Sequence, residues 1–431
     1  MNASLVAYSV LAWAAQPLLR RKLRKRAKAE PGYAEAIPER FGRYTPANLG
    51  RDAAGQWIWV HAVSLGETRA AALLIKELRR AMPGMRLLLT HGTATGRAEG
   101  RKLLQPGDVQ VWQPWDSRAP VQRFLQQFQP AVGVLMETEV WPNLVAACQQ
   151  RQVPLVLANA RLNAKSQAGA LRWPSLFLPT YAGLRAAWAQ TPEDAQRLQS
   201  VGAPVQGVLG NLKFDVQPES ALIAQGAAWR AASAKPVVIV ASSREGEEAQ
   251  WLAQWAGRKF HGVAGQCQWL IVPRHPQRFD AVHQLLLDAG LTVARRSSWG
   301  QGLPPTQVDV WLGDSLGEMP LYYAAAHIGL LGGSFEPLGG QNLIEAAACG
   351  CPLVVGPHTF NFAQAAQQAC EAGAAFRVLD MEQGVQLATA LARNPAELAQ
   401  ARQAALAFAQ AHRGAAAATA QAIAAVVHAA P

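Results

Sequence analysis

Short apolar runs alternate with amphipathic stretches along most of this chain, and loops rich in glycine, proline or small polar residues separate them. The clearest apolar runs cover residues 57–63, 132–136, 237–241, 269–272 and 328–331. A short apolar run followed by a helical pattern is typical of βα units in a parallel sheet. The alternation pauses between about Lys213 and Lys235 and then restarts. The pattern therefore predicts two doubly wound α/β domains.

The most distinctive loop follows the predicted strand Ile328–Leu331 and leads into an alanine-rich helix that is expected to end near Cys349 and Gly350. Its glycines would let the backbone approach a ligand closely, and the helix start would offer N–H groups to an anion. The polar side chains that could contact hydroxyls or a base edge are Glu336, Asn342 and Glu345. This arrangement suits a sugar nucleotide, although an ordinary βα turn with a capped helix has the same pattern.

Three carboxylates follow predicted strands in the first half of the chain. Glu67 lies after the strand 57–63, where a helix begins at about Thr68. A glutamate there could take a proton from a hydroxyl if burial raises its pKa, or it could simply complement the helix dipole. Glu137 and Glu139 follow the strand 132–136. If that strand continues, both point the same way and repel, which would raise one pKa; two acids capping a helix are the alternative.

Charge and cysteine content exclude several classes of protein. The formal net charge is +11, but seven positive charges lie between Arg20 and Lys28, so the charge describes one segment and no nucleic-acid-binding face. The five cysteines are scattered, which fits buried thiols in a reducing compartment. No Asp-x-Asp triplet occurs, so the usual ligands for a metal-bound nucleotide diphosphate are missing from the sequence.

The N-terminal segment combines an apolar run, Ala3–Leu19, with the basic cluster that follows it. As one helix the run would span about 25 Å, against a hydrocarbon core of about 30 Å. The basic residues follow the apolar run, which favours an uncleaved membrane anchor with the rest of the chain in the cytoplasm. A helix lying in the membrane interface is the alternative.

Five stretches together resemble the Kdo transferases, which add 3-deoxy-D-manno-octulosonic acid (Kdo) to lipid A precursors. They are His-Ala-Val-Ser-Leu-Gly-Glu at 61–67, Glu-Thr-Glu-Val-Trp-Pro-Asn at 137–143, Pro-Arg-His-Pro at 273–276, and the loops at 332–345 and 351–362. Matches recur from about Gly32 to Phe362. The chain departs from the family at Ser243-Arg244, where Thr-His is usual, and at Asn163, where serine is usual.

The resemblance implies the GT-B glycosyltransferase architecture, with two Rossmann-like domains facing a central cleft. We expect an anchor with its basic flank at 1–30, an acceptor-binding domain at 31–213, a CMP-Kdo-binding domain at 214–400, and a helix packing back across the domains at 401–431. The expected location is the cytoplasmic face of the bacterial inner membrane. The expected partners are CMP-Kdo, a lipid A precursor and the membrane, with no nucleic acid, cofactor or metal.

The family also implies roles for single residues. A glucosamine hydroxyl would attack CMP-Kdo with inversion, and Glu67 would accept the proton of that hydroxyl. Glu137 and Lys213 would stabilise the transition state. The expected donor-binding residues are Pro273, Arg274, His275, Leu316, Gly317, Glu318, Asn342, Leu343, Ile344 and Glu345. The expected acceptor-side and other cleft residues are Ser64, Gly66, Thr95, Gly96, Glu139, Arg161 and Glu336.

Two alternatives remain at this stage. A GT-B transferase that uses a UDP-sugar at the membrane would share the fold, and competition by CMP against UDP would distinguish it. A membrane-bound nucleotide-binding protein without catalysis would bind CMP but show no turnover.

Overall fold

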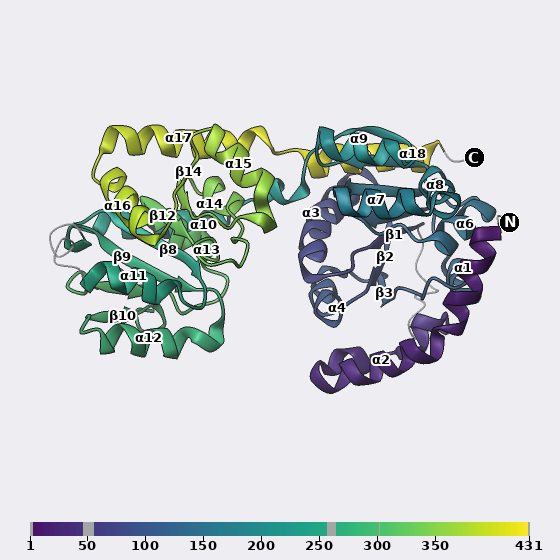
Figure 1. Cartoon of the computed structure of the whole chain (residues 1–431), viewed down its shortest axis with the longest axis horizontal. Helices are drawn as coiled ribbons and strands as arrows, with labels where there is room; N and C mark the ends of the chain where they lie inside the picture. Colours follow the sequence, from purple (N-terminus) through teal and green to yellow (C-terminus); the bar gives the residue numbers. More distant parts are fainter. Residues whose placement is uncertain (1–2, 46–55, 257–263, 301, 430–431) are drawn as a thin grey trace. The chain divides into compact units, whose positions relative to one another are not determined.

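The computed structural model describes residues 3–45, 56–256, 264–300 and 302–429. The chain divides into two compact units (Figure 1). The first unit contains Met1–Asp215 and Arg413–Pro431, and the second contains Val216–His412. Within the described residues, each unit holds one seven-stranded sheet in which all neighbouring strands are parallel. The two α/β domains expected from the sequence are confirmed.

The sheet of the first unit has the order β3-β2-β1-β4-β5-β6-β7. Its strands are β1 (Trp57–His61), β2 (Arg86–His91), β3 (Val109–Trp112), β4 (Val132–Met136), β5 (Leu155–Ala160), β6 (Ala186–Ala189) and β7 (Val205–Val208). The order reverses at β1, which pairs with both β2 and β4. Open parallel sheets bind ligands outside the carboxyl ends of the strands at such a reversal. The loops after β1 and β4 therefore occupy the position where a site is expected.

Helices cover both faces of this sheet. They are α3 (Leu65–Ala81), α4 (Ala94–Gly100), α5 (Arg118–Phe128), α6 (Pro142–Gln150), α7 (Ala164–Arg172), α8 (Pro174–Ala182), α9 (Pro192–Ser200) and α18 (Ala415–His428). Successive strand residues point to opposite faces. Trp59 accordingly packs in one core with Phe124, while Ile58 packs in the other with Leu74 of α3 and Ile423 of α18. The last helix of the chain is thus part of the first unit's core.

The sheet of the second unit has the order β10-β11-β9-β8-β12-β13-β14. Its strands are β8 (Val237–Ser243), β9 (Gln268–Pro273), β10 (Val293–Arg295), β11 (Val310–Leu312), β12 (Ile328–Leu331), β13 (Leu353–Val355) and β14 (Ala375–Arg377). Its helices are α10 (Ser220–Ala232), α11 (Glu247–Ala256), α12 (Phe279–Asp288), α13 (Met319–Ala325), α14 (Ile344–Ala348), α15 (Ala363–Glu371), α16 (Met381–Ala392) and α17 (Pro395–Ala411). Here the order reverses at β8, so the loops after β8 and β12 lie at the corresponding switch point.

The apolar N-terminal run is divided between two helices, α1 (Ala3–Ala14) and α2 (Gln16–Ala29). Pro17 lies in the first turn of α2, where its missing N–H leaves no helical hydrogen bond unmade. A single helix running through this point would lack one backbone hydrogen bond. Across the parts of the chain that the structure describes, no helix is both long enough and apolar enough to cross a membrane.

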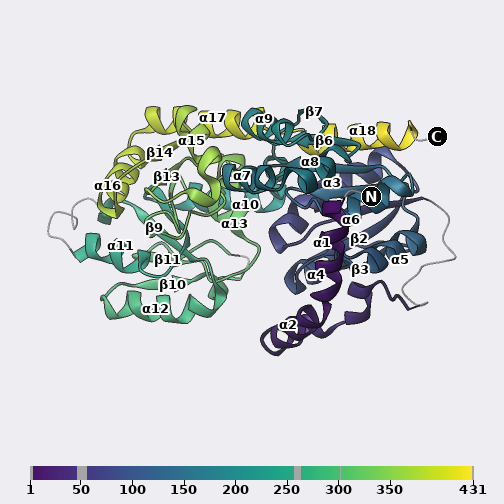
Figure 2. The same ribbon diagram turned by 45° about the vertical axis from the view of Figure 1, so that its right-hand side comes forward.

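Both N-terminal helices are attached to the first unit, with α1 beside α6 and α8 (Figure 2). The attachments are a hydrogen bond of 2.6 Å from Ser9 Oγ to Asn143 Oδ1, one of 2.9 Å from Gln16 Nε2 to Ser117 Oγ, and the Arg20 guanidinium 3.8 Å above the Phe41 ring. After α2 the chain passes through two short 3₁₀ helices, η1 (Pro31–Ala34) and η2 (Ile37–Phe41).

Candidate active site

Glu67 lies in the first turn of α3, directly beyond the carboxyl end of β1. Its Oε2 accepts a hydrogen bond from Val63 N at 2.8 Å, and its Oε1 accepts one from Ser64 Oγ at 3.0 Å. Ser64 is the N-cap of α3 and in turn accepts from Glu67 N. These reciprocal bonds resemble a capping box. They hold the carboxylate at the carboxyl-end edge of the sheet, so helix capping and a chemical role are compatible.

Glu137 forms a second acidic centre at the end of β4. The strand stops at Met136, and Glu137 adopts a left-handed backbone with φ 57°. The alternation that would have placed Glu137 and Glu139 on one strand face therefore does not apply. The Glu137 side chain is buried and forms ion pairs with Arg161 Nε at 2.8 Å and Lys213 Nζ at 3.5 Å. A strained backbone and a buried charge with two cations are features often found at functional sites.

Burial and mutual repulsion raise the pKa values of Glu67 and Glu139 in this cluster. Burial raises the pKa of Glu67, and the charge of Glu137 raises it further, while the hydrogen bonds from Val63 and Ser64 oppose the shift. Burial also raises the pKa of Glu139 to about 7, and Glu67 adds more to this shift than Glu137 does. Trp141 Nε1 donates to Glu139 at 3.0 Å. The cluster can therefore exchange a proton near neutral pH, as a general base must.

The loop after β2 packs against the Glu67 loop. Thr93 caps α4 by accepting from Gly96 N at 3.2 Å, and its hydroxyl donates to Val63 O at 2.9 Å. A Cβ on Gly96 would lie 2.9 Å from Val63 O, so only glycine allows this approach. Thr95 and Gly66 are both exposed. The structure therefore brings Ser64, Gly66, Thr95 and Gly96 to one edge of the first unit.

Arg97 belongs to α4, the helix that follows this loop, but its side chain is engaged in other contacts. Its side chain is buried and forms an ion pair with Glu39 at 3.0 Å. Glu39 also accepts from Trp112 N at 2.9 Å. The arginine thus ties η2 to the sheet.

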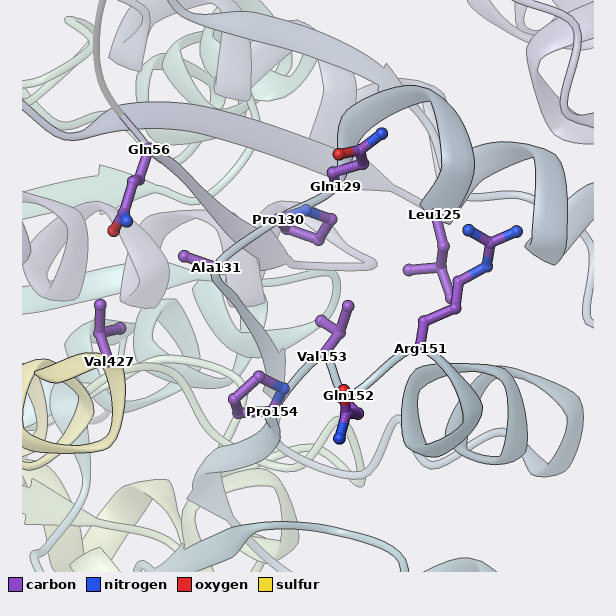
Figure 3. A pocket seen from close by; sticks show the side chains of 10 residues that line it. All are labelled: Gln56, Leu125, Gln129, Pro130, Ala131, Arg151, Gln152, Val153, Pro154 and Val427. Carbon is purple, nitrogen blue, oxygen red and sulfur yellow. The ribbon is translucent and has the colours of Figure 1, made fainter. Parts of the chain in front are cut away.

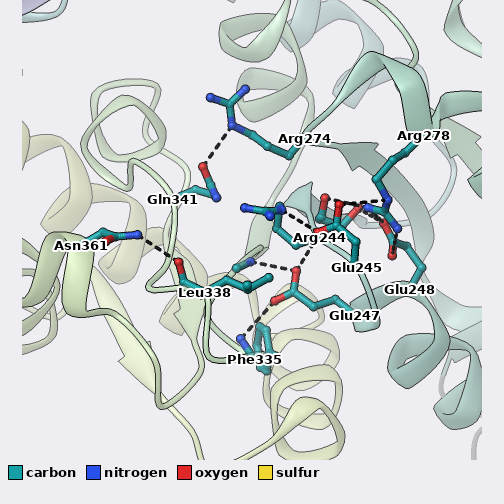
Figure 4. A network of polar contacts seen from close by, with 12 residues as sticks. Arg244, Glu245, Glu247, Glu248, Arg274, Arg278, Phe335, Leu338, Gln341 and Asn361 are labelled. Carbon is teal, nitrogen blue, oxygen red and sulfur yellow. Dashed lines mark hydrogen bonds and ion pairs between the residues drawn. The ribbon is translucent and has the colours of Figure 1, made fainter. Parts of the chain in front are cut away.

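In the second unit, Glu247 joins the loop after β8 to the glycine-rich loop after β12 (Figure 4). Its carboxylate is fully buried and accepts from the backbone N–H groups of Arg244, Gly333 and Phe335, at 2.8, 2.8 and 3.1 Å. Burial raises its pKa, and the three N–H groups oppose that shift. Glu247 was not among the site residues predicted from the sequence. The available signal was an acid in the first turn of a helix that follows a buried strand.

Arg274 lies at the edge of the same group of loops. Its backbone N–H donates to Ser243 O at 2.9 Å, and its Nε donates to Gln341 Oε1 at 3.1 Å (Figure 4). His275 follows it, and burial together with the charges of Arg244 and Arg274 lowers the pKa of this imidazole. Pro273 is the buried last residue of β9. The structure therefore places Arg274 and His275 next to the glycine-rich loop.

The residues at the start of α14 divide into two kinds. Leu343 and Ile344 are buried in the core, so only their backbone groups could face a ligand. Asn342 Oδ1 accepts from Ile344 N at 3.1 Å, and Glu345 lies in the first turn of the helix. Glu336, in the loop before them, accepts from Gln250 Nε2. Any contact of Leu343 or Ile344 with a ligand would therefore be made by main-chain atoms.

The segment Leu316–Glu318 follows β11 and presents different groups. Leu316 is exposed, and Gly317 has φ 85° with no neighbouring atom within 4 Å of a Cβ built there. Glu318 pairs with Arg296 at 2.8 Å and accepts from Ser315 Oγ. The carboxylate of Glu318 thus already has partners, while the backbone at Gly317 is open.

Two cavities lie at opposite ends of the first unit's sheet. A cavity of about 610 Å³ is lined by Gln56, Ala131 and Pro154, which precede β1, β4 and β5, so it lies at the amino ends of these strands (Figure 3). A smaller cavity of about 260 Å³ is lined by Val63, Thr93 and Glu139 at the carboxyl ends. The smaller cavity is at the edge where parallel α/β sheets place their ligands.

Known proteins are similar to this chain over most of its length. A family model described as 3-deoxy-D-manno-octulosonic-acid transferase (kdotransferase) matches residues 35–216. A 3-deoxy-D-manno-octulosonic acid transferase of Bordetella pertussis is 46% identical over 412 residues, which cover 93% of this chain and 94% of the relative. The transferase of the same description from Haemophilus influenzae is 31% identical over 361 residues, with 82% of each chain covered.

A solved structure supports the fold. The chain is similar to a glycosyltransferase from Rickettsia africae, with a TM-score of 0.57 and 12% sequence identity, and the match covers 88% of this chain and 100% of that one. At this identity the likeness concerns the fold alone.

Proposed function

Because this chain belongs to the family of 3-deoxy-D-manno-octulosonic acid (Kdo) transferases, glycosyltransferases of lipopolysaccharide biosynthesis, we propose that its donor is CMP-Kdo and its acceptor a glucosamine hydroxyl of a lipid A precursor. The observation that carries the residue assignment is the cluster of Glu67, Glu137 and Glu139 beside the carboxyl ends of β1 and β4. Such a cluster supplies a carboxylate whose pKa is raised for proton transfer.

In the proposed reaction, the acceptor oxygen forms a bond to the anomeric carbon of Kdo while the bond from that carbon to the phosphate oxygen breaks. CMP leaves with the electron pair of the broken bond, and the anomeric configuration inverts. Glu67 accepts the proton of the attacking hydroxyl. Its raised pKa favours proton acceptance, and its bonds to Val63 and Ser64 fix its direction. Glu139 is the second group of the cluster that can share a proton near neutral pH.

Glu137, Arg161 and Lys213 form the electrostatic part of the first unit's site. The two cations reach one buried carboxylate from the loop after β5 and from the short helix η5 (Leu212–Asp215). We assign them to stabilising the negative charge that develops as the phosphate leaves. Fixed charges in a water-poor site are effective in this role because they need little reorganisation during the reaction.

The second unit supplies the groups assigned to the donor. Arg274 can contact a phosphate through its guanidinium, and His275 and the backbone N–H groups of the glycine-rich loop add further donors. Asn342 and Glu345, at the start of α14, are assigned to hydroxyls or the base. We propose a metal-independent reaction, in which these hydrogen-bond donors offset the negative charge of the phosphate. Activity should then be unchanged by a chelator.

The N-terminal helices support a location at the cytoplasmic face of the inner membrane. Apolar side chains of α1 are exposed, among them Leu11 and Trp13, each 69% exposed. The basic residues Arg20, Arg21 and Lys22 of α2 follow them and are exposed too. Apolar and basic side chains in one segment favour binding to anionic lipid, where the acceptor also resides.

The proposal is tested by mass analysis of the product formed from CMP-Kdo and a tetra-acylated lipid A precursor, with CMP and UDP as competitors. We expect an acceptor heavier by the mass of a Kdo residue, and stronger inhibition by CMP than by UDP. Transfer from a UDP-sugar with stronger inhibition by UDP would contradict the donor assignment. CMP binding without turnover would contradict a catalytic role.

A further inference from the structure

The cavity of about 260 Å³ at the carboxyl ends of β1 and β4 has α2 as one of its walls. One side is apolar, formed by Leu19 and Leu23 of α2 together with Tyr33, Trp115 and Trp141. The helix is held in place here because Leu23 is buried and the Arg26 guanidinium lies 5.4 Å from the centre of the Tyr33 ring. Glu139, which accepts from Trp141 Nε1, and Val63, whose N–H donates to Glu67, line the cavity too. The cavity is thus bordered both by α2 and by the loop that holds the proposed base.

Polar groups of this cavity point to an occupant that carries oxygen atoms and negative charge. Lys22 and Arg26 of α2 line it and are exposed. Arg40 also lines it, is 3% exposed, and has its guanidinium 3.9 Å from the centre of the Trp112 ring. The Nε–H of Arg40 and the Nε1–H of Trp115 have no hydrogen-bond acceptor among the described residues. Both nitrogens are covered by protein atoms, so the cations that an occupant of the cavity can reach directly are Lys22 and Arg26.

The acids of the same cavity do not oppose an anionic occupant strongly. Asp116 is engaged with the backbone N–H groups of Asn143 and Leu144, at 3.1 and 2.8 Å. Burial raises the pKa of Asp116 to about 6 and that of Glu139 to about 7. Three cations against two partly neutralised acids leave the cavity positive. An amphiphile with an apolar chain and an anionic headgroup fits both halves of the lining.

We propose that this cavity is a subsite for one acyl chain of the acceptor lipid. The chain lies against Leu19, Leu23 and Trp115, and the lipid's phosphate faces Lys22 and Arg26. The inference rests on the proposed function, because it assumes that the acceptor's hydroxyl reaches Glu67. It makes α2 part of acceptor recognition and not only an attachment to the membrane.

The test compares two neighbouring leucines of α2. Leu19 lines the cavity, whereas Leu18 is 69% exposed and does not. Kinetics of the full chain in detergent micelles are measured with the acylated precursor and with the same glycan phosphate freed of its acyl chains. We expect Leu19→Gln to raise KM for the acylated acceptor about tenfold, with KM for the deacylated one unchanged. Leu18→Gln should change neither value. Leu19→Trp, which fills the cavity, should act like Leu19→Gln.

The outcomes separate the two proposals. The acyl-chain subsite would be overturned if Leu19→Gln and Leu18→Gln changed KM equally, or if Leu19→Gln changed KM equally for both acceptors. Either result would leave the proposal of Kdo transfer intact. A phospholipid with chains of the same length that competes with the acceptor at equal concentration would overturn the assignment to the acceptor. A wild-type chain that makes no Kdo product from either acceptor would overturn the proposed function itself. Activity retained on the deacylated acceptor shows that each variant is folded.

Discussion

At the scale of single residues, the acids of the first unit differ in how they are held. Glu137 is buried against Arg161 and Lys213, so its charge is offset. Glu139 is held by a single hydrogen bond from Trp141, and burial raises its pKa to about 7. Glu67 accepts two hydrogen bonds but still has a raised pKa. We therefore propose that Glu67 and Glu139 are the groups that exchange a proton, while Glu137 holds Arg161 and Lys213 in place.

The titration of Glu139 predicts a pH-dependent stability. The folded pKa is about 7, above the ordinary value of 4.5, so the protonated form favours folding. This contribution is fully present below pH 4.5 and is lost as the pH rises to about 7, with an upper limit of roughly 3 kcal/mol. Glu139→Gln should remove this part of the pH dependence. The measurement is the free energy of unfolding by urea between pH 4.5 and 8.

The matched control for this experiment is Glu77→Gln on α3, whose carboxylate makes a surface ion pair with Arg80. Surface pairs contribute little to stability, so the control should follow the wild-type pH dependence. If Glu139→Gln keeps the wild-type slope between pH 4.5 and 7, the raised pKa of Glu139 is wrong.

At the scale of elements, Glu247 connects two loops of the second unit that are far apart in sequence. Its carboxylate accepts from the N–H groups of Gly333 and Phe335 in the glycine-rich loop, and from Arg244 N in its own loop. The other backbone N–H groups of that loop are the proposed donors to the phosphate of CMP-Kdo. The geometry of the donor site therefore depends on a residue that need not touch the donor.

Replacing Glu247 by Gln should weaken donor binding because an amide offers only one acceptor oxygen to three N–H groups. We expect KM for CMP-Kdo to rise about tenfold, with a smaller change in kcat, and stability to fall by about 1–3 kcal/mol. The control is Glu245→Gln in the same loop, since Glu245 is exposed and pairs only with Arg244 and Arg278 among the described residues. A loss of stability with unchanged KM would show that Glu247 has no positioning role.

Elements with long apolar runs were predictable from the sequence, and short ones were not. The expected strands 132–136 and 328–331 coincide with β4 and β12, because four or five buried residues leave a clear signal. The strands Val293–Arg295, Val310–Leu312 and Ala375–Arg377 contain only three residues each, which is too few for a recognisable period.

The candidate site was predictable to the same limited extent. The family resemblance assigned Glu67, Glu137 and Lys213 to one reaction, and the first unit places Lys213 Nζ 3.5 Å from the Glu137 carboxylate and Glu137 close enough to Glu67 to raise its pKa. The roles of the buried residues Glu247 and Arg40 depend on contacts between segments that are far apart in the chain. Glu247 and Gly333, for example, are separated by 86 residues. No local pattern contains that information.

At the scale of the whole molecule, we propose that the N-terminal segment binds the membrane that carries the lipid substrate. We expect binding to anionic vesicles to depend on the exposed apolar residues of α1 and to weaken with salt because of the basic residues of α2. Trp13→Ser should lower the fraction of protein that sediments with vesicles by several-fold. Leu379→Ser is the control, since Leu379 is similarly exposed, at 75% against 69%, but lies in the second unit. Equal losses in both variants would argue against a specific role of α1.

The most direct test of the account is single-turnover transfer by Glu67→Gln, compared with Glu77→Gln on the same helix. The amide keeps an oxygen that can accept from Val63 N but cannot take a proton, so we expect the rate of Kdo transfer to fall by about 10² or more. The affinity for CMP should stay within about twofold of the wild type, and Glu77→Gln should transfer at the wild-type rate. A Glu67→Gln enzyme that keeps most of its activity would contradict the assignment of Glu67 as the proton acceptor.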